Sequence, residues 1–418
     1  MVETIFFRSD FMKKFVVNGG YALSGSVRVS GSKNAALPII FATLITRGVS
    51  RISNIPYIKD VGVAIDLISR YGAKCSIDGG ILTVNTESLC YTPPDVRSIR
   101  KIRASTYLIG ACLARFGEYE LSGFGGCSFS PRPIDLHLLA ARSLGATECG
   151  NALYARTLRG CVIDFPKVSV GATVNAIIMS ASAEGTTVIK NYAREPHVYA
   201  LIDFLNSAGA SITRGADTLT VEGRELHGGE YSLEGDMIEA GTYLVAGLIT
   251  GGRVTVTGIP TDQLAAFTST LIDSGARIDI LPDAVTAQAS GILKPMSVVS
   301  APYPAFATDL QPIIAPLLAK NSGGTITDLV WRERFGYLHT LGAFGIGYTL
   351  SDNTARIEGS SFHSASVTSP DLRGGMAALL TALSAKGRSE IYSPELILRG
   401  YDSPVEKLAK IGANIRFE

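Results

Sequence analysis

The chain has 418 residues, of which 46% are apolar and only 18% are charged. This length exceeds one ordinary domain, and the composition excludes a disordered chain, so we expect two or three domains with large apolar cores. Lys and Arg exceed Asp and Glu by only one. That balance argues against a nucleic-acid-binding or membrane-surface protein, and any anion site must therefore be local.

The beginning of the chain and its cysteines predict a compartment. The first fifteen residues include acidic residues and no long apolar stretch, so they do not predict an export signal. The longest apolar run, residues 35–45, is broken by Pro38 and is too short to span a bilayer. The cysteines show no Cys-x-x-Cys spacing, which indicates reduced thiols rather than a zinc site. We expect a cytoplasmic protein without a metal or a cofactor. The cysteines are Cys75, Cys90, Cys112, Cys127, Cys149 and Cys161.

A pattern of helix, Gly-Ala and strand occurs six times along the chain, from "LISRYGAKCSI" to "LAKIGANIRF". Each glycine is expected at a helix C-terminus, where a left-handed residue precedes the next strand. These glycines are spaced 64 to 73 residues apart, at Gly72, Gly145, Gly209, Gly275, Gly342 and Gly412.

A second element repeats with the same spacing. It consists of an apolar helix of small residues, a glycine and a β-rich segment. Helices with few charges on any face are expected inside a layer rather than on a surface. Six units, each with one buried and one amphipathic helix and with strands, predict two domains of three units. The segments are residues 33–52, 103–121, 170–189, 239–256, 308–327 and 372–391.

The start of each buried helix carries polar or charged residues. Helix N-termini present free N–H groups and a partial positive charge, and lysine or arginine at four of the six ends favours phosphate or carboxylate binding. One alternative is that these basic side chains are merely solvated, and Asp236 is also consistent with a simple helix cap. The residues are Lys33 and Asn34, Arg103, Lys167 and Ser169, Asp236, Thr308 and Asp309, and Arg373.

The stretch "GFGGCSFSPRPIDLH", residues 123–137, places Cys127 after two glycines and shortly before Arg132. Such a glycine- and proline-rich segment is typical of an exposed, shaped loop, where a thiol reacts rather than packs. An inert loop thiol is the alternative. We interpret the other five cysteines as packing residues, and His137 as a packed or capping histidine.

These stretches resemble the bacterial UDP-N-acetylglucosamine enolpyruvyl transferases, from about residue 13 to the C-terminus. The resemblance implies an α/β fold of two inside-out barrels, built from six repeated units, three per domain, that close like a clamshell. One domain would comprise residues 33–234, and the other residues 1–32 plus 235–418. The motifs are "GSKNAALP", "IRASTYLIG", "GGCSFSPRPIDLH", "KVSVGATV", "AREP", "PAFATDLQ", "RGYDSPVEKL" and "GANI".

The resemblance also implies a reaction. The enolpyruvyl group of phosphoenolpyruvate moves to the 3′-hydroxyl of UDP-N-acetylglucosamine and phosphate is released, as the first committed step of peptidoglycan synthesis. The reaction passes through a tetrahedral phospho-ketal and needs a proton donor, a base and several cations. Cys127, which fosfomycin alkylates in this family, would donate the proton to C3, and Asp309 would handle the proton of the 3′-hydroxyl.

The resemblance assigns the remaining site residues to parts of the two substrates. Lys33, Arg103, Arg132 and Arg399 would bind phosphoenolpyruvate with support from Arg373, and Asn34 would lie near the sugar hydroxyl. The uracil would contact Arg132, Pro133, Ile134, Asp135 and Leu136, and the diphosphate Lys167, Val168, Ser169, Val170 and Gly171, with Val330 as a further substrate contact. Arg373 and Arg399 could instead be salt-bridge partners between the domains.

The chain departs from the family pattern at several segments, two of which carry changes of charge. "RERF", residues 332–335, replaces the usual Glu-Asn-Arg-Phe or Glu-Ser-Arg-Phe, and "EPHVYA" lacks two usual carboxylates at His197 and Ala200. An alternative function is therefore a paralogue acting on another uridine nucleotide, such as UMP in nucleoside-antibiotic biosynthesis. A non-catalytic nucleotide-binding relative is a further alternative, but Cys127, Asp309 and Lys33, whose loss it would predict, are all present.

Overall fold

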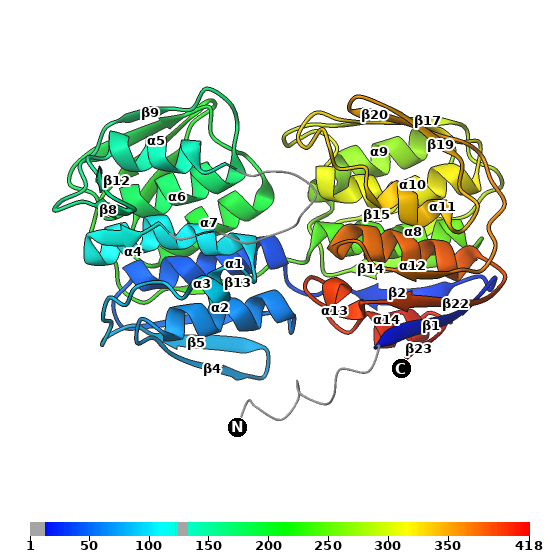
Figure 1. Cartoon of the computed structure of the whole chain (residues 1–418), viewed down its shortest axis with the longest axis horizontal. Coiled ribbons are helices and arrows are strands. Elements are labelled where there is room, and N and C mark those ends of the chain that lie inside the picture. The colour runs from blue at the N-terminus through cyan, green and yellow to red at the C-terminus, as the bar shows by residue number, and fades with distance from the viewer. Residues whose placement is uncertain (1–12, 122, 124–132) are drawn as a thin grey trace.

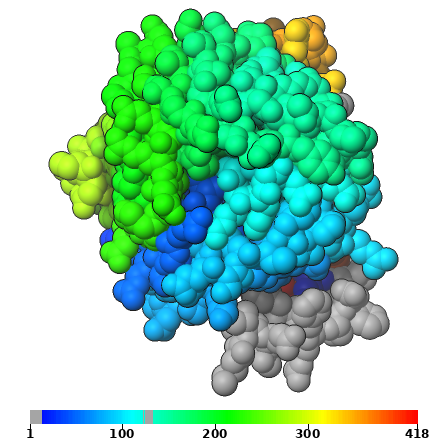
Figure 2. Space-filling view, turned by 90° about the vertical axis from the view of Figure 1, so that its left-hand side faces the viewer, coloured from blue at the N-terminus to red at the C-terminus, as the bar shows by residue number. Residues whose placement is uncertain are grey.

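The computed structural model describes residues 13–121, 123 and 133–418. Two lobes lie side by side, each with its own apolar core (Figure 1). The first core runs from Ala35 to Leu233, and the second combines Phe15–Val29 with Ile238–Ile415. Early, middle and late parts of the chain of the first lobe all contribute to its outer face (Figure 2).

The first lobe holds three described sheets, with strand orders β13-β3-β5-β4, β6-β8-β7 and β11-β12-β10-β9. Its strands are β3 (Val49–Ser53), β4 (Lys74–Asp78), β5 (Ile81–Asn85), β6 (Glu118–Glu120), β7 (Thr147–Cys149), β8 (Ala152–Tyr154), β9 (Val162–Asp164), β10 (Thr186–Lys190), β11 (Ser211–Arg214), β12 (Thr218–Glu222) and β13 (Glu230–Ser232). Its helices are α1 (Lys33–Ala42), η1 (Thr43–Ile45), α2 (Lys59–Ser69), α3 (Val96–Ile99), η2 (Arg103–Tyr107), α4 (Leu108–Phe116), α5 (Asp135–Ser143), α6 (Val170–Ser180) and α7 (Pro196–Ser207).

The second lobe holds three described sheets, with orders β21-β22-β1-β23, β15-β16-β14-β2 and β17-β18-β20-β19. Its strands are β1 (Lys14–Gly19), β2 (Ser24–Arg28), β14 (Arg253–Thr257), β15 (Arg277–Leu281), β16 (Ala284–Gln288), β17 (Met296–Ser300), β18 (Gly324–Asp328), β19 (Tyr348–Ser351), β20 (Thr354–Ile357), β21 (Ser366–Thr368), β22 (Gly387–Tyr392) and β23 (Asn414–Phe417). Its helices are α8 (Met237–Ile249), η3 (Thr261–Leu264), α9 (Ala265–Asp273), η4 (Thr308–Leu310), α10 (Gln311–Lys320), α11 (Tyr337–Gly342), α12 (Leu372–Ser384), α13 (Pro394–Ile397) and α14 (Pro404–Lys410).

One strand pattern recurs in all five four-stranded sheets of the described residues. In the sheet of β17 to β20, β17 pairs parallel with β18, where Met296 lies opposite Gly324, and β20 and β19 follow antiparallel. The parallel pairs of the other four sheets are β13 with β3, β9 with β10, β2 with β14, and β21 with β22. This recurrence is the structural form of the repeat in the sequence.

The apolar helices lie inside each lobe and the sheets lie outside them, which is the inside-out arrangement. In the second lobe α8, α10 and α12 pack on one another, and α8 is buried continuously from Ile238 to Ile249. In the first lobe α4 packs against α1 and α6. A helix buried on every side needs apolar or small residues around its whole circumference, and these helices have that composition. The expected α/β fold of two inside-out barrels is confirmed.

Two expectations from the sequence are wrong in detail. Gly342 does not have a left-handed backbone, because α11 continues through it, and Gly345 takes the positive φ of 93° instead. Cys90 and Cys149 are exposed rather than packed, since Cys149 ends β7 at a hairpin and Cys90 lies in a loop. Cys112 is fully buried, and burial raises the pKa of its thiol to about 12.

The two chain crossings between the lobes lie side by side. Gly31 and Gly235 form an antiparallel bridge, and the Ser32 N–H donates to the Glu234 carbonyl at 2.8 Å. A Cβ on Gly31 would lie 1.9 Å from the Asn54 carbonyl oxygen, so the crossing fits only without a side chain. The crossings therefore bring the starts of α1 and α8 together. Within the described residues, no helix has the length and apolar character needed to cross a bilayer.

Candidate active site

The predicted residue Lys33 stands at the start of α1, where the two lobes meet. Ser32 caps this helix by accepting the Ala35 N–H, and Lys33 is 9% exposed. Its Nζ lies 2.8 Å from Oδ2 of Asp60, the second residue of α2. Burial lowers the pKa of Lys33, the cations Arg373 and Arg399 lower it further, and Asp60 opposes them.

Asp60 is shared with Arg399 from the other lobe. The Arg399 Nε donates to Asp60 Oδ1 at 2.8 Å, and its Nη2 donates to the Lys101 carbonyl at 3.2 Å. Asp60 is only 4% exposed, so this ion pair is largely removed from solvent. Lys33, Asp60 and Arg399 form the first ion cluster. It shows that Arg399 is a salt-bridge partner between the lobes as well as a predicted substrate contact.

A second carboxylate is also shared by two cations. Asp309 accepts a hydrogen bond from Arg334 Nη1 at 2.6 Å and another from Arg373 Nη2 at 2.9 Å. Burial acts to raise the pKa of Asp309, but the two guanidiniums outweigh it and hold that pKa well below its usual range. Arg334, Asp309 and Arg373 form the second ion cluster, which lies wholly in the second lobe.

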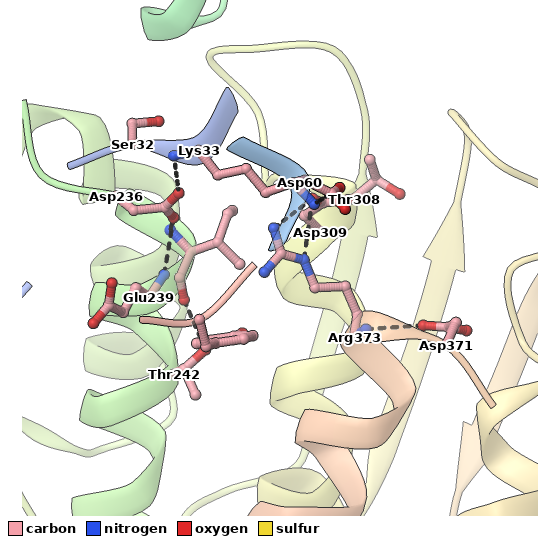
Figure 3. Close-up of polar contacts among 12 residues, drawn as sticks. Ser32, Lys33, Asp60, Asp236, Glu239, Thr242, Thr308, Asp309, Asp371 and Arg373 are labelled. Atoms are coloured by element: carbon pink, nitrogen blue, oxygen red, sulfur yellow. Dashed lines mark hydrogen bonds and ion pairs between the residues drawn. The ribbon is translucent and has the colours of Figure 1, made fainter. Parts of the chain in front are cut away.

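Helix α12 positions Arg373. Its N-cap Asp371 accepts the Arg373 and Gly374 N–H groups at 2.8 and 2.9 Å, as Figure 3 shows for Arg373. The guanidinium is buried, lies 5.5 Å from the ring centre of Tyr401 and faces Asp309. Burial alone would lower the pKa of Arg373, but the facing Asp309 outweighs it and raises that pKa. Arg373 therefore stays charged.

Asp236 joins the two lobes at their crossings. Its Oδ1 accepts the Ile238 and Glu239 N–H groups at 2.8 and 3.0 Å, which makes it the N-cap of α8. Its Oδ2 accepts the Lys33 backbone N–H at 3.1 Å (Figure 3). The helix-cap interpretation is thus correct, and the same carboxylate also fixes the start of α1.

Three helices of the first lobe that carry residues predicted to bind the substrates pack together. Ser169 caps α6, and α6 packs against α5, which begins at Asp135, and against η2, which begins at Arg103. His137 connects them as a packed histidine, with its Nδ1 2.6 Å from the Asn175 amide nitrogen. A Cβ on Gly171 would lie 2.9 Å from the His137 ring.

Burial lowers the pKa of His137 to about 4, with Arg103 adding to the effect. The imidazole is therefore neutral at pH 7 and does not supply a charge to the site.

Of four further predicted residues, two lie outside the part of the chain that the structure describes and two lie within it. Cys127 and Arg132 lie outside the described residues. Asn34, the second residue of α1, is half-buried beside Lys33. Val330 is also half-buried and donates its N–H to Asp328 at 2.9 Å.

Sequence reasoning missed Asp60 and Arg334, although both contact predicted residues. Within the "RERF" departure, Arg332 is exposed and pairs with Asp352, whereas Arg334 two residues later is buried against Asp309. Arg334 stands in a turn, where a single arginine does not indicate a site. A buried cation needs a carboxylate partner, and this requirement could have suggested that an acidic residue such as Asp60 lies among the predicted cations.

His197, the other departure, lies at the start of α7 and is half-buried. Burial lowers its pKa, while the charges of the acids Glu195, Asp309 and Asp236 oppose that shift. The histidine therefore puts an imidazole, rather than a carboxylate, at the start of α7.

The two ion clusters contain four cations and two carboxylates, with a net charge of +2 when Lys33 is protonated. Lys33 and Arg373 lie close enough for one to affect the pKa of the other. Two partly compensated clusters at the junction of the lobes suit a multiply charged anion such as a phosphate ester. Among the described residues, no group of three or more His, Cys, Asp or Glu side chains could hold a metal ion.

Comparisons with known proteins agree with this geometry. The EPSP synthase (3-phosphoshikimate 1-carboxyvinyltransferase) family matches residues 17–408. A UDP-N-acetylglucosamine 1-carboxyvinyltransferase from Chlorobium phaeovibrioides is 40% identical, over 97% of this chain and 98% of its own. The crystal structure of the enolpyruvyl transferase NikO from Streptomyces tendae matches with a TM-score of 0.88 and 28% identity, over 98% of this chain and 99% of its own. An EPSP synthase from Acinetobacter baumannii shares the fold, with a TM-score of 0.74 and 18% identity over 97% of this chain and 100% of its own.

Proposed function

Since the chain belongs to the EPSP synthase family and, within it, to the UDP-N-acetylglucosamine 1-carboxyvinyltransferases, we propose that it transfers the enolpyruvyl group of phosphoenolpyruvate to the 3′-hydroxyl of UDP-N-acetylglucosamine. This is the first committed step of peptidoglycan synthesis. The observation that carries the proposal is the pair of ion clusters, which combine Lys33, Asp309, Arg373 and Arg399 at the junction of the lobes. We further propose a cytoplasmic enzyme that has no nucleic-acid or membrane partner.

The proposed chemistry is addition followed by elimination. In the addition, the sugar 3′-oxygen bonds to C2 of phosphoenolpyruvate, its proton passes to a base, and Cys127 protonates C3. In the elimination, the bond from C2 to the phosphate oxygen breaks and a proton leaves the new methyl group, which restores the double bond. Lys33, Arg103, Arg132 and Arg399 would offset the charge of the phosphate and carboxylate throughout.

Asp309 is proposed to receive the proton of the 3′-hydroxyl. While both arginines contact it, its pKa lies well below the usual range, and the carboxylate is therefore a weak base. It gains basicity if Arg334 or Arg373 turns from the carboxylate to the substrate. In this proposal, substrate binding itself activates the base.

We also propose, from the resemblance to the family, which residues bind the uridine diphosphate part of the acceptor. The stretch 133–136 with Arg132 would hold the uracil, and residues 167–171 at the start of α6 would hold the diphosphate. The support is the packing of α5 on α6 in the first lobe and the helix N-terminus of α6, where N–H groups favour an anion. Asn34 would lie near the sugar hydroxyl, and Val330 would be a further substrate contact.

A second candidate is transfer to another uridine nucleotide such as UMP. The observation that favours it is His197, which stands at the start of α7 where the family pattern has a carboxylate, and whose pKa responds to the charge of Asp309. A side chain of different charge at this position would alter which acceptor fits.

One experiment tests both candidates. Phosphate release from phosphoenolpyruvate is measured with UDP-N-acetylglucosamine and with UMP in parallel. Release with the sugar nucleotide, abolished by Cys127→Ala and by fosfomycin, supports the main proposal. Release with UMP alone contradicts it and supports the second candidate.

A further inference from the structure

The start of α2 docks on the turn that follows α13, although the two segments belong to different lobes. The Lys59 N–H donates to the Leu398 carbonyl at 3.1 Å, and the Tyr57 N–H donates to Asp402 Oδ2 at 3.0 Å. Backbone groups of residues 57–59 thus hold this segment against residues 398–402. These two hydrogen bonds, one to a main-chain carbonyl and one to a side-chain carboxylate, set the position of Asp60 relative to Arg399.

Asp60 uses both of its oxygens in this contact. Oδ1 accepts from Arg399 Nε at 2.8 Å, and Oδ2 lies 2.8 Å from Lys33 Nζ and 3.4 Å from Arg399 Nη2. Gly400 leaves room for the lysine, because a Cβ there would lie 3.3 Å from Lys33 Cδ. The carboxylate thus stands between two cations from different lobes (Figure 3 shows Lys33 with Asp60).

We propose that Asp60 is a positioning residue for phosphoenolpyruvate, which aligns Lys33 and Arg399 so that both cations meet the same anion. The inference rests on the proposed function, in which these two cations bind the substrate. Asp60 itself does not touch the reacting atoms in this scheme. It acts through the two side chains that it holds.

The charges around Lys33 show why this carboxylate matters. Lys33 faces Asp60 from α2, Arg373 from α12 and Arg399 beyond α13, and its backbone N–H faces Asp236. Burial and the two arginines lower its pKa, and Asp60 raises it. Without Asp60 the lysine would lose its proton at lower pH, and a neutral amine attracts a phosphate poorly.

The test is Asp60→Asn, which keeps the size of the side chain and removes its charge. We expect the affinity for phosphoenolpyruvate, measured by calorimetry, to fall about 10-fold to 100-fold, because misplaced binding groups cost that much. We also expect the alkaline limb of kcat/KM for phosphoenolpyruvate to move to lower pH by about one to three units, since an opposite charge at this distance shifts a pKa by that amount.

Two further variants separate charge, position and folding. Asp66→Asn changes an exposed residue of the same helix and is expected to leave both readouts at the wild-type level. Asp60→Glu keeps the charge on a longer side chain, so we expect the alkaline limb to stay near the wild type while the KM for phosphoenolpyruvate remains raised. If Asp60→Asn fails to fold by circular dichroism, Asp60→Glu carries the test, and a wild-type KM in that variant overturns the proposal.

The result that overturns the inference is an Asp60→Asn enzyme with wild-type affinity and a wild-type alkaline limb. Equal losses in Asp60→Asn and Asp66→Asn overturn it as well, since they indicate a general effect on the helix. Failure of the proposed function is a different result. In that case the wild-type protein releases no phosphate with either acceptor, while calorimetry still reports whether anion affinity depends on Asp60.

Discussion

Replacing Arg334 by methionine tests the balance of charges at Asp309. The Asp309 carboxylate is held by two guanidiniums, and Arg334 Nη1 lies 2.6 Å from its Oδ1. Methionine keeps much of the apolar volume of the arginine and removes its charge. One ion pair, to Arg373 at 2.9 Å, then remains.

The size of the effect follows from the distance and the exposure. Two unit charges about 4 Å apart attract by about 4 kcal/mol at an effective dielectric constant of about 20. That energy corresponds to about three pKa units. The Asp309 side chain is 28% exposed, so solvent screens part of the attraction. We therefore expect its pKa to rise by about one to three units in Arg334→Met.

The assay is the pH dependence of kcat/KM for the acceptor nucleotide. Asp309 is proposed to act ionised, and activity is therefore lost as the pH falls through its pKa, which lies well below the usual value in the wild type. In Arg334→Met we expect this acidic limb to appear at higher pH by about one to three units. Arg334→Lys retains a positive charge and is expected to show a smaller shift. Coincident acidic limbs in the wild type and Arg334→Met would refute the reasoning.

Two further predictions concern stability. Gly31→Ala places a Cβ 1.9 Å from the Asn54 carbonyl oxygen, so we expect a loss of about 1–3 kcal/mol in differential scanning calorimetry, whereas Gly62→Ala, which faces open space, should be neutral or slightly stabilising. Burial raises the pKa of Glu239 to about 7, so the folded protein binds a proton there that the unfolded chain releases, and this group costs stability as the pH rises from about 5 to 7. In Glu239→Gln that part of the pH dependence should vanish, and melting curves at pH 5 to 8 that fall in parallel with the wild type would contradict the assignment.

Much of the fold could be predicted because each repeat unit has a recognisable local pattern of helix, glycine and strand. Five of the six glycines have positive φ angles between 95° and 102°, each between a helix and the next strand. The exception arises in "LGAFGIG", where two glycines stand three residues apart and the helix runs past the first. A local pattern shows that a helix must end nearby, and packing decides at which glycine it ends.

The site could be predicted only in part, for a related reason. Lys33 and Arg373 stand at starts of buried helices, and the repeat itself shows that such starts correspond in space. Asp60 stands in the first turn of an amphipathic helix, where an acidic residue is ordinary and needs no partner. Its contact with Arg399 joins residues 339 positions apart, and no local pattern encodes such a pair.

Each carboxylate of the candidate site is shared by two cations. This sharing explains how the folded protein can tolerate buried cations and still attract an anion. A buried cation without a partner is strongly destabilising, so Arg373 and Lys33 each need a carboxylate nearby. Full pairing would leave no charge for a ligand. With Asp60 shared by Lys33 and Arg399, and Asp309 by Arg334 and Arg373, each cluster retains one positive charge. We expect an incoming phosphate to neutralise that charge. Because the first cluster spans both lobes, we also expect anion binding and the docking of α2 on the turn after α13 to strengthen each other.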